Sequence, residues 1–349
     1  MARPVFARVL VSVSAFVLFA GATSWSLLMA WNAPVTPRQP RPAGYWFKGN
    51  VHTHSLRSDG DSTPDQVAAW YRDHDYDFLA LTDHNVLSPA GMLNARYGAD
   101  HQFLILQGEE VTDSSDGRPI HLNGLGVSAS VEPQHGANAV DVMQRNADAI
   151  RRAGGVPLLN HPNYLSPIGA ETLRQVERAP LLELFNGNPT TNTFGSQGVP
   201  GVEELWDRML SSGRLAYGVA DDDAHSFRSS DPGTAGPGRG WVFVHAERLA
   251  AQPILAALER GDFYASTGVE LSNYEVTATG LTVEIREELS RTYRMQFIGR
   301  NGRVLEEATS TCASYTFSDT DAYVRVRIQD SSGALAWTQP VFRQGPSPN

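Results

Sequence analysis

The chain has 349 residues, of which 41% are hydrophobic, and its formal net charge at pH 7 is -10. This length and composition argue against a disordered chain and predict one large hydrophobic core, alone or with a small second core. The acidic balance excludes a broad basic surface for a nucleic-acid backbone. Cys312 is the only cysteine. A disulfide framework and a thiolate zinc site within one chain are therefore excluded, so any metal ion must bind to His, Asp or Glu.

The N-terminal segment is typical of an exported protein. Two arginines precede an apolar run that extends to about Trp31. Residues 20–22 offer a cleavage site for a signal peptidase, but the run continues beyond them and is long enough to span a bilayer. Residues 1–31 are therefore predicted to be a signal peptide or an N-terminal membrane anchor, and residues 32–44 a proline-rich linker. In both cases the rest of the chain is expected in the periplasm or outside the cell.

From residue 45 to residue 270, short apolar strands alternate with segments of helical periodicity. One helix is indicated by a capping box at Thr63 followed by Pro64, and another, from about Val140, ends before Gly154. Such alternation is typical of a parallel sheet or barrel wrapped by helices. We expect strands at residues 46–54, 78–82, 103–111, 121–127, 156–160, 181–185 and 216–220. These seven units predict a barrel-like α/β domain over residues 45–270.

The sequence pattern changes after a last helix, which is predicted at residues 249–260. Several later segments alternate apolar and polar residues, and turn sequences such as Asn301-Gly302 and Ser332-Gly333 separate them. Such alternation indicates antiparallel strands with one buried face. Residues 271–345 are therefore predicted to form a small β-sandwich-like domain.

Histidines and carboxylates recur at the ends of the predicted strands. His52 and His54 close the first strand, and because side chains alternate along a strand, both imidazoles point to the same side. A lone His-x-His pair is a weak signal, since two partly exposed histidines would give the same pattern. However, similar motifs end or open the later strands: Thr82-Asp83-His84, Gly108-Glu109-Glu110, His121, Asn160-His161-Pro162 and Asp223-Ala224-His225. A parallel barrel places its active site at such strand ends, so the pattern predicts a centre for zinc, manganese or iron.

These motifs, together with Asp59-Gly60 and in this order along residues 45–270, resemble those of the polymerase and histidinol phosphatase (PHP) superfamily. So many spaced motifs in sequence order make the resemblance specific. It implies a distorted seven-stranded β/α barrel that holds two or three divalent metal ions at the C-terminal ends of its strands. It also implies that the chain is a metal-dependent hydrolase.

The resemblance assigns nine residues to three metal sites. It implies a first metal ion at His52, His54, Glu110 and Asp223, a second at Glu110, His121 and His161, and a third at Asp59, His84 and His225. Some family members have histidine where this chain has Asp59, so the third site is the most open of the three. The residues implied to act in catalysis are Glu110, Asp223 and His225.

Neighbouring carboxylates compete for two of these positions. Glu109 competes with Glu110, and Asp221 and Asp222 compete with Asp223. The family glutamate stands two residues after a glycine, and the family aspartate stands two residues before a histidine. This spacing selects Glu110 and Asp223.

Few cations are available for an anionic substrate. Lys48 is the only lysine, and it lies on the same face of the first strand as the two histidines, where substrate contact and an ion pair with Glu183 are both open. Arg57 and Arg228 directly follow metal motifs, so each is either a phosphate-binding residue or a solvated loop arginine. Glu183 and Asn186 are candidates for supporting the metal ligands or contacting the substrate.

The metal cluster indicates a hydrolase. Metal ions that share a water molecule lower its pKa enough to give hydroxide near neutral pH. They also stabilise the attacking and the leaving oxygen of an in-line displacement. Glu110 is the natural bridging ligand because a carboxylate has two oxygens. We therefore expect a phosphoesterase with a metal-bridged hydroxide that acts on a small molecule or a short phosphoester. Since no lysine follows Lys48, the bridging carboxylated lysine of binuclear amidohydrolases is excluded.

Two alternatives stay open. Residues 47–55, 261–268 and 336–340 resemble an exported branch of the superfamily that contains carbaryl-type carbamate and ester hydrolases, which cleave a carbonyl ester with the same metal ligands. The other alternative is a non-catalytic envelope module whose β-domain binds a glycan or a partner. Loss of catalysis usually erodes metal ligands, and all nine positions hold residues that bind metals, which argues against this module.

Overall fold

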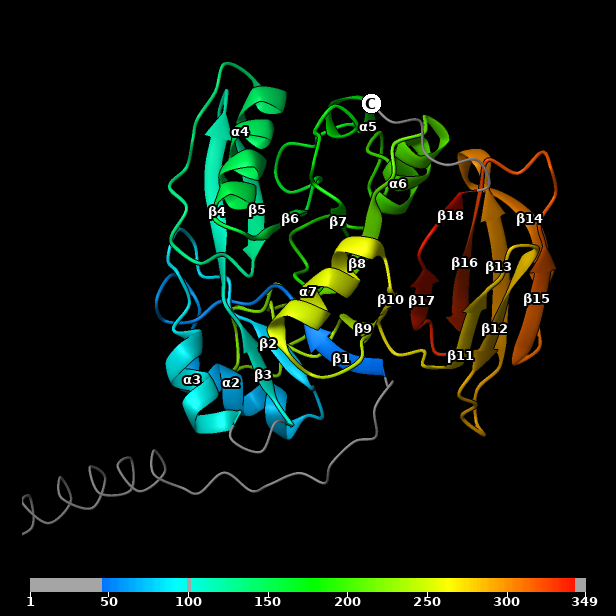
Figure 1. Cartoon of the computed structure of the whole chain (residues 1–349), viewed down its shortest axis with the longest axis horizontal. Helices are drawn as coiled ribbons and strands as arrows, with labels where there is room; N and C mark the ends of the chain where they lie inside the picture. The colour runs from blue at the N-terminus through cyan, green and yellow to red at the C-terminus, as the bar shows by residue number, and fades with distance from the viewer. Residues whose placement is uncertain (1–45, 99–101, 343–349) are drawn as a thin grey trace, which may run out of the picture. The chain divides into compact units, whose positions relative to one another are not determined.

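The computed structural model describes residues 46–98 and 102–342, which form a mixed α/β fold with several sheets (Figure 1). The predicted export signal and proline-rich linker lie outside the described residues. Within these ranges, no helix has the length and apolar character needed to cross a membrane. The helices in these ranges are α2 (Pro64–Asp73), α3 (Ala90–Tyr97), α4 (Ala139–Arg152), α5 (Ala170–Leu173), α6 (Val202–Ser211) and α7 (Ala251–Arg260).

One sheet of ten strands runs through much of the fold. Its order is β14 (Arg303–Ala308), β13 (Tyr293–Gly299), β16 (Tyr323–Asp330), β17 (Leu335–Thr338), β10 (Phe263–Ser266), β9 (Trp241–His245), β1 (Trp46–Asn50), β2 (Phe78–Ala80) and β3 (Leu104–Leu106), with β18 (Val341–Phe342) paired to β16. Strands β1, β2 and β3 are parallel, as the sequence predicts. The strands on the other side of β1 pair in antiparallel fashion.

A second sheet has five strands. Its order is β4 (Gly108–Ser115), β5 (Arg118–Leu125), β6 (Val156–Leu159), β7 (Leu181–Asn186) and β8 (Tyr217–Asp221). Strands β6, β7 and β8 are parallel, but β5 is antiparallel to both β4 and β6. The prediction of parallel strands is wrong here, because Asp116 and Gly117, with φ of 51° and 75°, form a two-residue turn that folds β5 back onto β4.

The predicted strand at residues 103–111 divides in two. Its first part is β3, which pairs with β2, and its second part begins β4, which pairs with β5. Isolated bridges join the two sheets beyond the ends of β1 and β2, from Thr53 to Ala224 and from His84 to Glu110. Across the described ranges the paired strands do not close into a barrel. The seven-stranded barrel therefore stays a prediction.

Local sequence signals account for the helices. Helix α2 begins with the predicted capping box, in which the Thr63 hydroxyl accepts from the Gln66 backbone and the Gln66 side chain accepts from the Thr63 backbone. The second predicted helix is α4, which Asn138 caps, and the last one is α7. Both bury an apolar face against strands. Helix α7 ends at Gly261, whose φ of 79° suits glycine.

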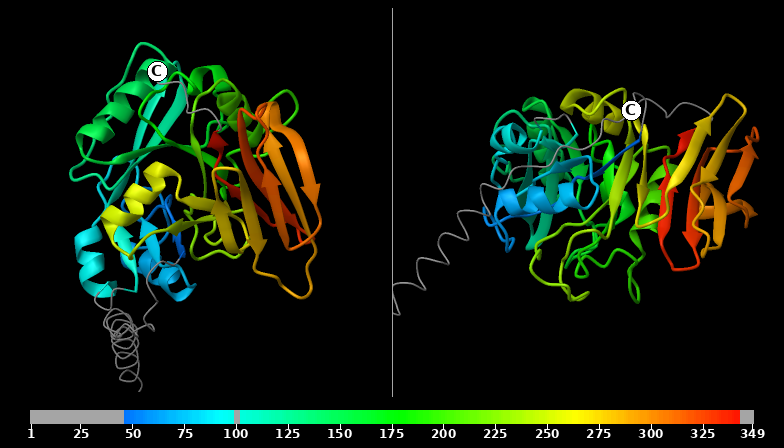
Figure 2. Two further views of the ribbon diagram at one scale, coloured as in Figure 1. Left: turned by 45° about the vertical axis from the view of Figure 1, so that its right-hand side comes forward. Right: turned by 90° about the horizontal axis from the view of Figure 1, so that it is seen from below.

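The C-terminal strands form a third sheet and extend the first one. The third sheet has the order β11 (Leu271–Val276), β12 (Gly280–Ile285) and β15 (Cys312–Thr316). Its inner side chains share a hydrophobic core with residues of the ten-stranded sheet such as Phe297 and Val326. Both views in Figure 2 show the later strands, in orange and red, side by side. Because β10 pairs with β17, one sheet continues across the domain boundary that is predicted near residue 270.

Candidate metal centre

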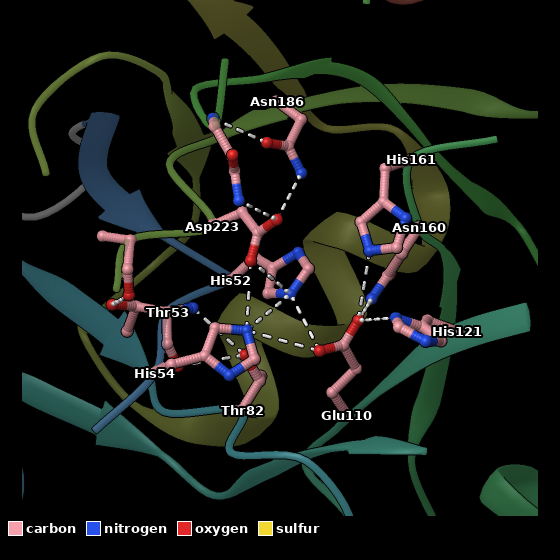
Figure 3. A network of polar contacts seen from close by, with 12 residues as sticks. His52, Thr53, His54, Thr82, Glu110, His121, Asn160, His161, Asn186 and Asp223 are labelled. Carbon is pink, nitrogen blue, oxygen red and sulfur yellow. Dashed lines mark hydrogen bonds and ion pairs between the residues drawn. The ribbon is translucent and has the colours of Figure 1, made fainter. Parts of the chain in front are cut away.

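The nine predicted metal ligands lie in one cluster, most of which is drawn in Figure 3. The ends of parallel strands and one hairpin bring them together. They come from the segment after β1 (His52, His54, Asp59), the segment after β2 (His84), the β4–β5 hairpin (Glu110, His121), the segment after β6 (His161) and the segment after β8 (Asp223, His225).

Four ligand atoms converge at the first predicted site. His52 Nε2 and His54 Nε2 are 3.2 Å apart. Glu110 Oε2 lies 3.4 Å from the former and 3.3 Å from the latter, and Asp223 Oδ1 lies 3.3 Å and 3.1 Å from the same two nitrogens. Two imidazoles and two carboxylates at this spacing suit a divalent transition metal.

Glu110 connects the first predicted site to the second. Its Oε1 lies 3.1 Å from His121 Nδ1 and 3.3 Å from His161 Nε2, while its Oε2 faces the histidines that follow β1. The side chain is completely buried, and histidine nitrogens surround Oε2, of which His84 Nδ1 lies 2.9 Å away. A buried carboxylate among imidazoles needs compensating positive charge, which protonated histidines or metal ions can supply. The geometry therefore fits a carboxylate that bridges two metal ions.

The third predicted site is more open to solvent. Asp59 Oδ2 lies 3.5 Å from His84 Nε2 and 3.3 Å from His225 Nε2, and its Oδ1 lies 3.4 Å from His54 Nδ1. The Asp59 side chain is 53% exposed, whereas Glu110 is buried. The three residues assigned to this site therefore lie together, on the solvent-facing side of the cluster.

Buried polar side chains hold the ligands in place. Glu183 accepts a hydrogen bond from His52 Nδ1 at 2.6 Å, which directs Nε2 of the same ring into the cluster. Asn186 donates to Glu183 at 2.9 Å and to Asp223 Oδ2 at 3.1 Å. The sequence predicts both residues as supporting groups, and in the structure both contact predicted ligands.

Of the two adjacent glutamates, Glu110 faces the cluster and Glu109 does not. Glu109 turns away from the cluster and accepts from the Val131 backbone N–H at 3.2 and 3.3 Å. Glu110 faces the cluster, where Asn160 donates to its Oε1 at 2.8 Å. Successive side chains of a strand point to opposite faces, so only one of the two glutamates can face the histidines.

The three consecutive aspartates also differ in their surroundings. Asp222 accepts hydrogen bonds from the backbone N–H groups of residues 238–240 and so fixes that loop. Asp221 is buried beside Glu183, and burial together with the charge of Glu183 raises its pKa well above the usual range. Asp223 has a φ of 47° and turns its carboxylate into the cluster.

Opposite charges dominate the pKa values in the cluster. Burial alone would lower the pKa of His84, but the charge of Glu110 and a hydrogen bond to Asp59 raise it to about 10. Burial also opposes protonation of His161 and His225, yet nearby carboxylates raise the pKa of both. Burial would raise the pKa of Glu110, but the histidines hold it well below its usual range. A bound cation would therefore replace protons on these histidines.

Lys48 lies apart from the cluster. Its amino group lies over the rings of Tyr76 and Trp241, 4.0 and 4.4 Å from their centroids. Lys48 does not form the ion pair with Glu183 that its strand position left open, because the two aromatic rings bind its ammonium group instead. Strand alternation predicts the face of a side chain but does not predict which neighbours it meets.

Arg57 and Arg228 are exposed on loops that follow metal motifs. Arg57 lies two residues before Asp59, and Arg228 three residues after His225. The backbone N–H of Arg228 donates to Asp61 at 3.2 Å, which ties the two loops together. Binding of phosphate by either guanidinium stays a prediction.

A small cavity of about 70 Å³ opens onto the cluster, and most of its wall consists of predicted ligands. Tyr164 and Asn188 complete the wall. The sequence analysis does not predict either residue, because neither lies in a ligand motif. The only indication in the sequence is that Tyr164 closely follows His161 and Asn188 closely follows Asn186. A larger cavity of about 570 Å³ lies beside Trp46, but none of the predicted ligands line it. The smaller cavity is therefore the candidate active site, because its wall carries the metal-binding side chains.

No family model matches the sequence, and no curated protein matches it either. Solved structures do match. A two-domain protein from Bacteroides vulgatus ATCC 8482, which contains a predicted PHP-like metal-dependent phosphoesterase, is 16% identical, and the match covers 89% of this chain and 99% of that one with a TM-score of 0.51. This likeness shows a shared fold.

Two further structures are similar over about half of this chain. An amidohydrolase from Chromobacterium violaceum with bound sulfate and no metal is 17% identical, over 52% of this chain and 88% of its own, with a TM-score of 0.39. A protein from Bifidobacterium adolescentis ATCC 15703, described as a metal-dependent phosphoesterase, is 15% identical, over 55% of this chain and 91% of its own, with a TM-score of 0.39.

Proposed function

We propose that this chain is a metal-dependent hydrolase of the PHP type that cleaves phosphoesters with two or three divalent metal ions, zinc, manganese or iron. The observation that carries the proposal is the position of Glu110. One of its oxygens faces His52 and His54, and the other faces His121 and His161. The fold shared with a protein that contains a predicted PHP-like metal-dependent phosphoesterase supports the same class.

The residues of the cluster hold the metal ions and orient the reacting groups. When bound, such ions activate water for attack and neutralise charge on the oxygens of an ester. Glu110 and Asp223 supply the negative charge that keeps cations close together. Glu183 fixes the ring of His52, and Asn186 fixes the carboxylate of Asp223. Buried walls around these groups exclude bulk water, which strengthens electrostatic interactions at the site.

Hydrolysis of a carboxyl ester or a carbamate is the second candidate. The side chains that line the cavity, all within the described ranges, include no arginine and no lysine. A dianionic phosphate group is therefore neutralised only by bound metal ions and histidines, whereas a carbonyl ester needs less positive charge. The same ligands serve both reactions, so this candidate differs from the first in the substrate alone.

We also propose that the chain acts outside the cytoplasm on a small or short substrate. Residues 1–31 support export, either with cleavage or as a membrane anchor. The cavity volume of about 70 Å³ supports a small reacting group. The net charge of -10 argues against a nucleic-acid partner.

A hydrolysis screen tests the function. The full chain is loaded in turn with zinc, manganese and iron(II), and each form receives an aryl phosphate monoester, an aryl phosphodiester, a carboxyl ester and a carbamate. Turnover of the phosphoesters supports the first candidate, and turnover of carbonyl esters alone supports the second. No turnover with any metal ion would contradict both and favour the non-catalytic envelope module.

A further inference from the structure

Tyr164 lines the cavity beside the metal ligands, and the proposed site has no role for it so far. The Tyr164 ring lies 5.2 Å from the His161 ring and 6.3 Å from the His121 ring, measured between centroids. It lines the same cavity as these two predicted ligands. Its hydroxyl makes no hydrogen bond to any residue in the ranges 46–98 and 102–342. A tyrosine whose hydroxyl has no partner among the described residues therefore lies beside the second predicted metal site.

The segment that carries Tyr164 is fixed by buried contacts. The Asn163 side chain is 3% exposed and donates to the carbonyl groups of Asn192 and Pro200 at 3.1 and 2.9 Å. The backbone N–H of Tyr164 donates to the carbonyl of His161 at 2.9 Å. A donor that is held by its own backbone needs little reorganisation when a charged group forms beside it.

The other uncharged side chain in the cavity wall already has partners. Asn188 Nδ2 donates to Asp223 Oδ2 at 3.4 Å, and Asn188 Oδ1 accepts from the backbone N–H of Thr190 at 3.1 Å. The remaining wall consists of predicted metal ligands, without arginine or lysine among the lining residues of the described chain. The Asn188 amide is thus already engaged with Asp223, whereas the Tyr164 hydroxyl has no partner among the described residues and is available to a bound molecule.

We propose that the Tyr164 hydroxyl donates a hydrogen bond to an oxygen atom of the substrate's ester group. This inference rests on the proposed function. A fixed donor stabilises the negative charge that develops on a phosphoryl or carbonyl oxygen during hydrolysis. The competing explanation is that the Tyr164 ring only packs against His161 and positions this ligand, in which case the hydroxyl has no role.

Two substitutions separate these explanations. Tyr164→Phe removes only the hydroxyl, and Tyr164→Leu also removes the ring. In the metal-loaded full chain, Tyr164→Phe is expected to keep its metal content and to lower kcat/KM on bis(p-nitrophenyl) phosphate or p-nitrophenyl acetate on the order of 10-fold or more. Tyr315→Phe is the matched control, because its hydroxyl donates to Asp321 among the C-terminal strands. A rate for Tyr164→Phe that equals the control, with loss of metal and activity only in Tyr164→Leu, would overturn the inference.

Phosphate binding provides a readout that does not depend on turnover. Calorimetry with inorganic phosphate is performed on the metal-loaded wild type, on Tyr164→Phe and on Tyr315→Phe. If the wild type hydrolyses no ester, the proposed function fails, and phosphate binding alone then decides the role of Tyr164. Weaker binding to Tyr164→Phe than to the control supports the inference. Equal affinity, or no phosphate binding by the wild type, overturns it.

Discussion

His52 donates a hydrogen bond of 2.6 Å from Nδ1 to Glu183, and both side chains are completely buried. The bond directs Nε2 toward Glu110 and Asp223, so that its lone pair would be available to a metal ion held together with these carboxylates. Residues that orient a ligand in this way usually change metal affinity by about 10- to 100-fold when they are replaced. We therefore expect Glu183→Gln to weaken metal binding to that extent while the protein stays folded.

Elemental analysis after dialysis against a graded chelator measures this effect. The wild type is expected to retain two or three ions per chain, and Glu183→Gln fewer at the same chelator concentration. Glu171→Gln, an exposed residue of α5, is the matched control. Equal metal content in the three proteins would assign Glu183 to packing alone, and at most one ion in the wild type would contradict a multinuclear centre.

Adjacent glutamates give a second matched pair. Glu110→Gln removes the charge of the proposed bridge at nearly constant volume, so activity is expected to fall by about 100-fold or more. Glu109→Gln should stay near wild type, because an amide oxygen still accepts from the Val131 backbone. Circular dichroism checks that both variants are folded. Similar activity in Glu110→Gln and wild type would move the bridging role to another carboxylate.

His225→Ala tests the third predicted site. If Asp59, His84 and His225 bind a metal ion that neutralises phosphate oxygens, phosphoester cleavage should slow on the order of 100-fold. Cleavage of a neutral carbonyl ester should fall much less, because Glu110 and its histidines are intact. Both substrates are measured on one preparation of the variant, which controls for folding and for metal content. Equal losses would indicate that His225 supports the first two sites instead.

Metal binding is expected to release protons. Burial opposes protonation of His84, but Glu110 and Asp59 raise its pKa to about 10, so the metal-free protein holds a proton there at neutral pH. A metal ion must displace this proton, and affinity should therefore rise with pH until about pH 10. Calorimetry at pH 7 in two buffers of different ionisation enthalpy measures the release. A binding heat that is independent of the buffer would contradict it.

The same protonation affects the stability of the metal-free protein. A histidine whose pKa is raised in the folded state stabilises that state fully below its unfolded pKa, near 6.5, and loses this contribution as pH rises toward about 10. Loss of the proton from His84 should therefore make the chelated protein less stable at pH 9 than at pH 7. The metal-loaded protein holds no proton on His84, so its stability should not fall for this reason.

A buried ion pair predicts a large change in stability. Arg325 on β16 donates to both oxygens of Asp207 on α6, at 2.9 and 2.6 Å, and both side chains are buried. Arg325→Met would leave buried carboxylates uncompensated and should cost about 3–5 kcal/mol in the free energy of unfolding. Arg327→Met is the matched control two residues along the strand. Its partial exposure and ion pair with Glu203 predict a loss of less than about 1 kcal/mol. Urea unfolding of both variants compares them, and equal losses would contradict the assignment.

Local signals explain what the sequence predicts well. The capping box at Thr63 and the helix stop at Gly154 depend on neighbours along the chain, and the structure contains both helices. The ligand cluster is also predictable, because its motifs recur at strand ends. The hairpin turn at Asp116 and Gly117 is a local signal too, but the pattern of parallel strands with helical crossovers does not include it.

Other features depend on contacts between distant segments. Lys48 packs against Tyr76 and Trp241, and no sequence pattern indicates which rings approach it. Tyr164 reaches the cavity because Asn163 ties its loop to the segment at residues 192–200. Such contacts follow from tertiary packing, so a periodicity argument cannot supply them.

The pairing of β10 with β17 also restricts how this chain can be divided or recombined. A shortened protein that ends near residue 270 would keep Phe263–Ser266 but lose the partner strand, and the unpaired backbone groups of β10 would form an exposed edge. Exposed edges recruit other strands, so such a fragment is expected to associate with copies of itself. A foreign module joined at this point would have to supply a strand in the register of Leu335–Thr338. The segment before residue 270 and the C-terminal strands are therefore expected to fold as one unit.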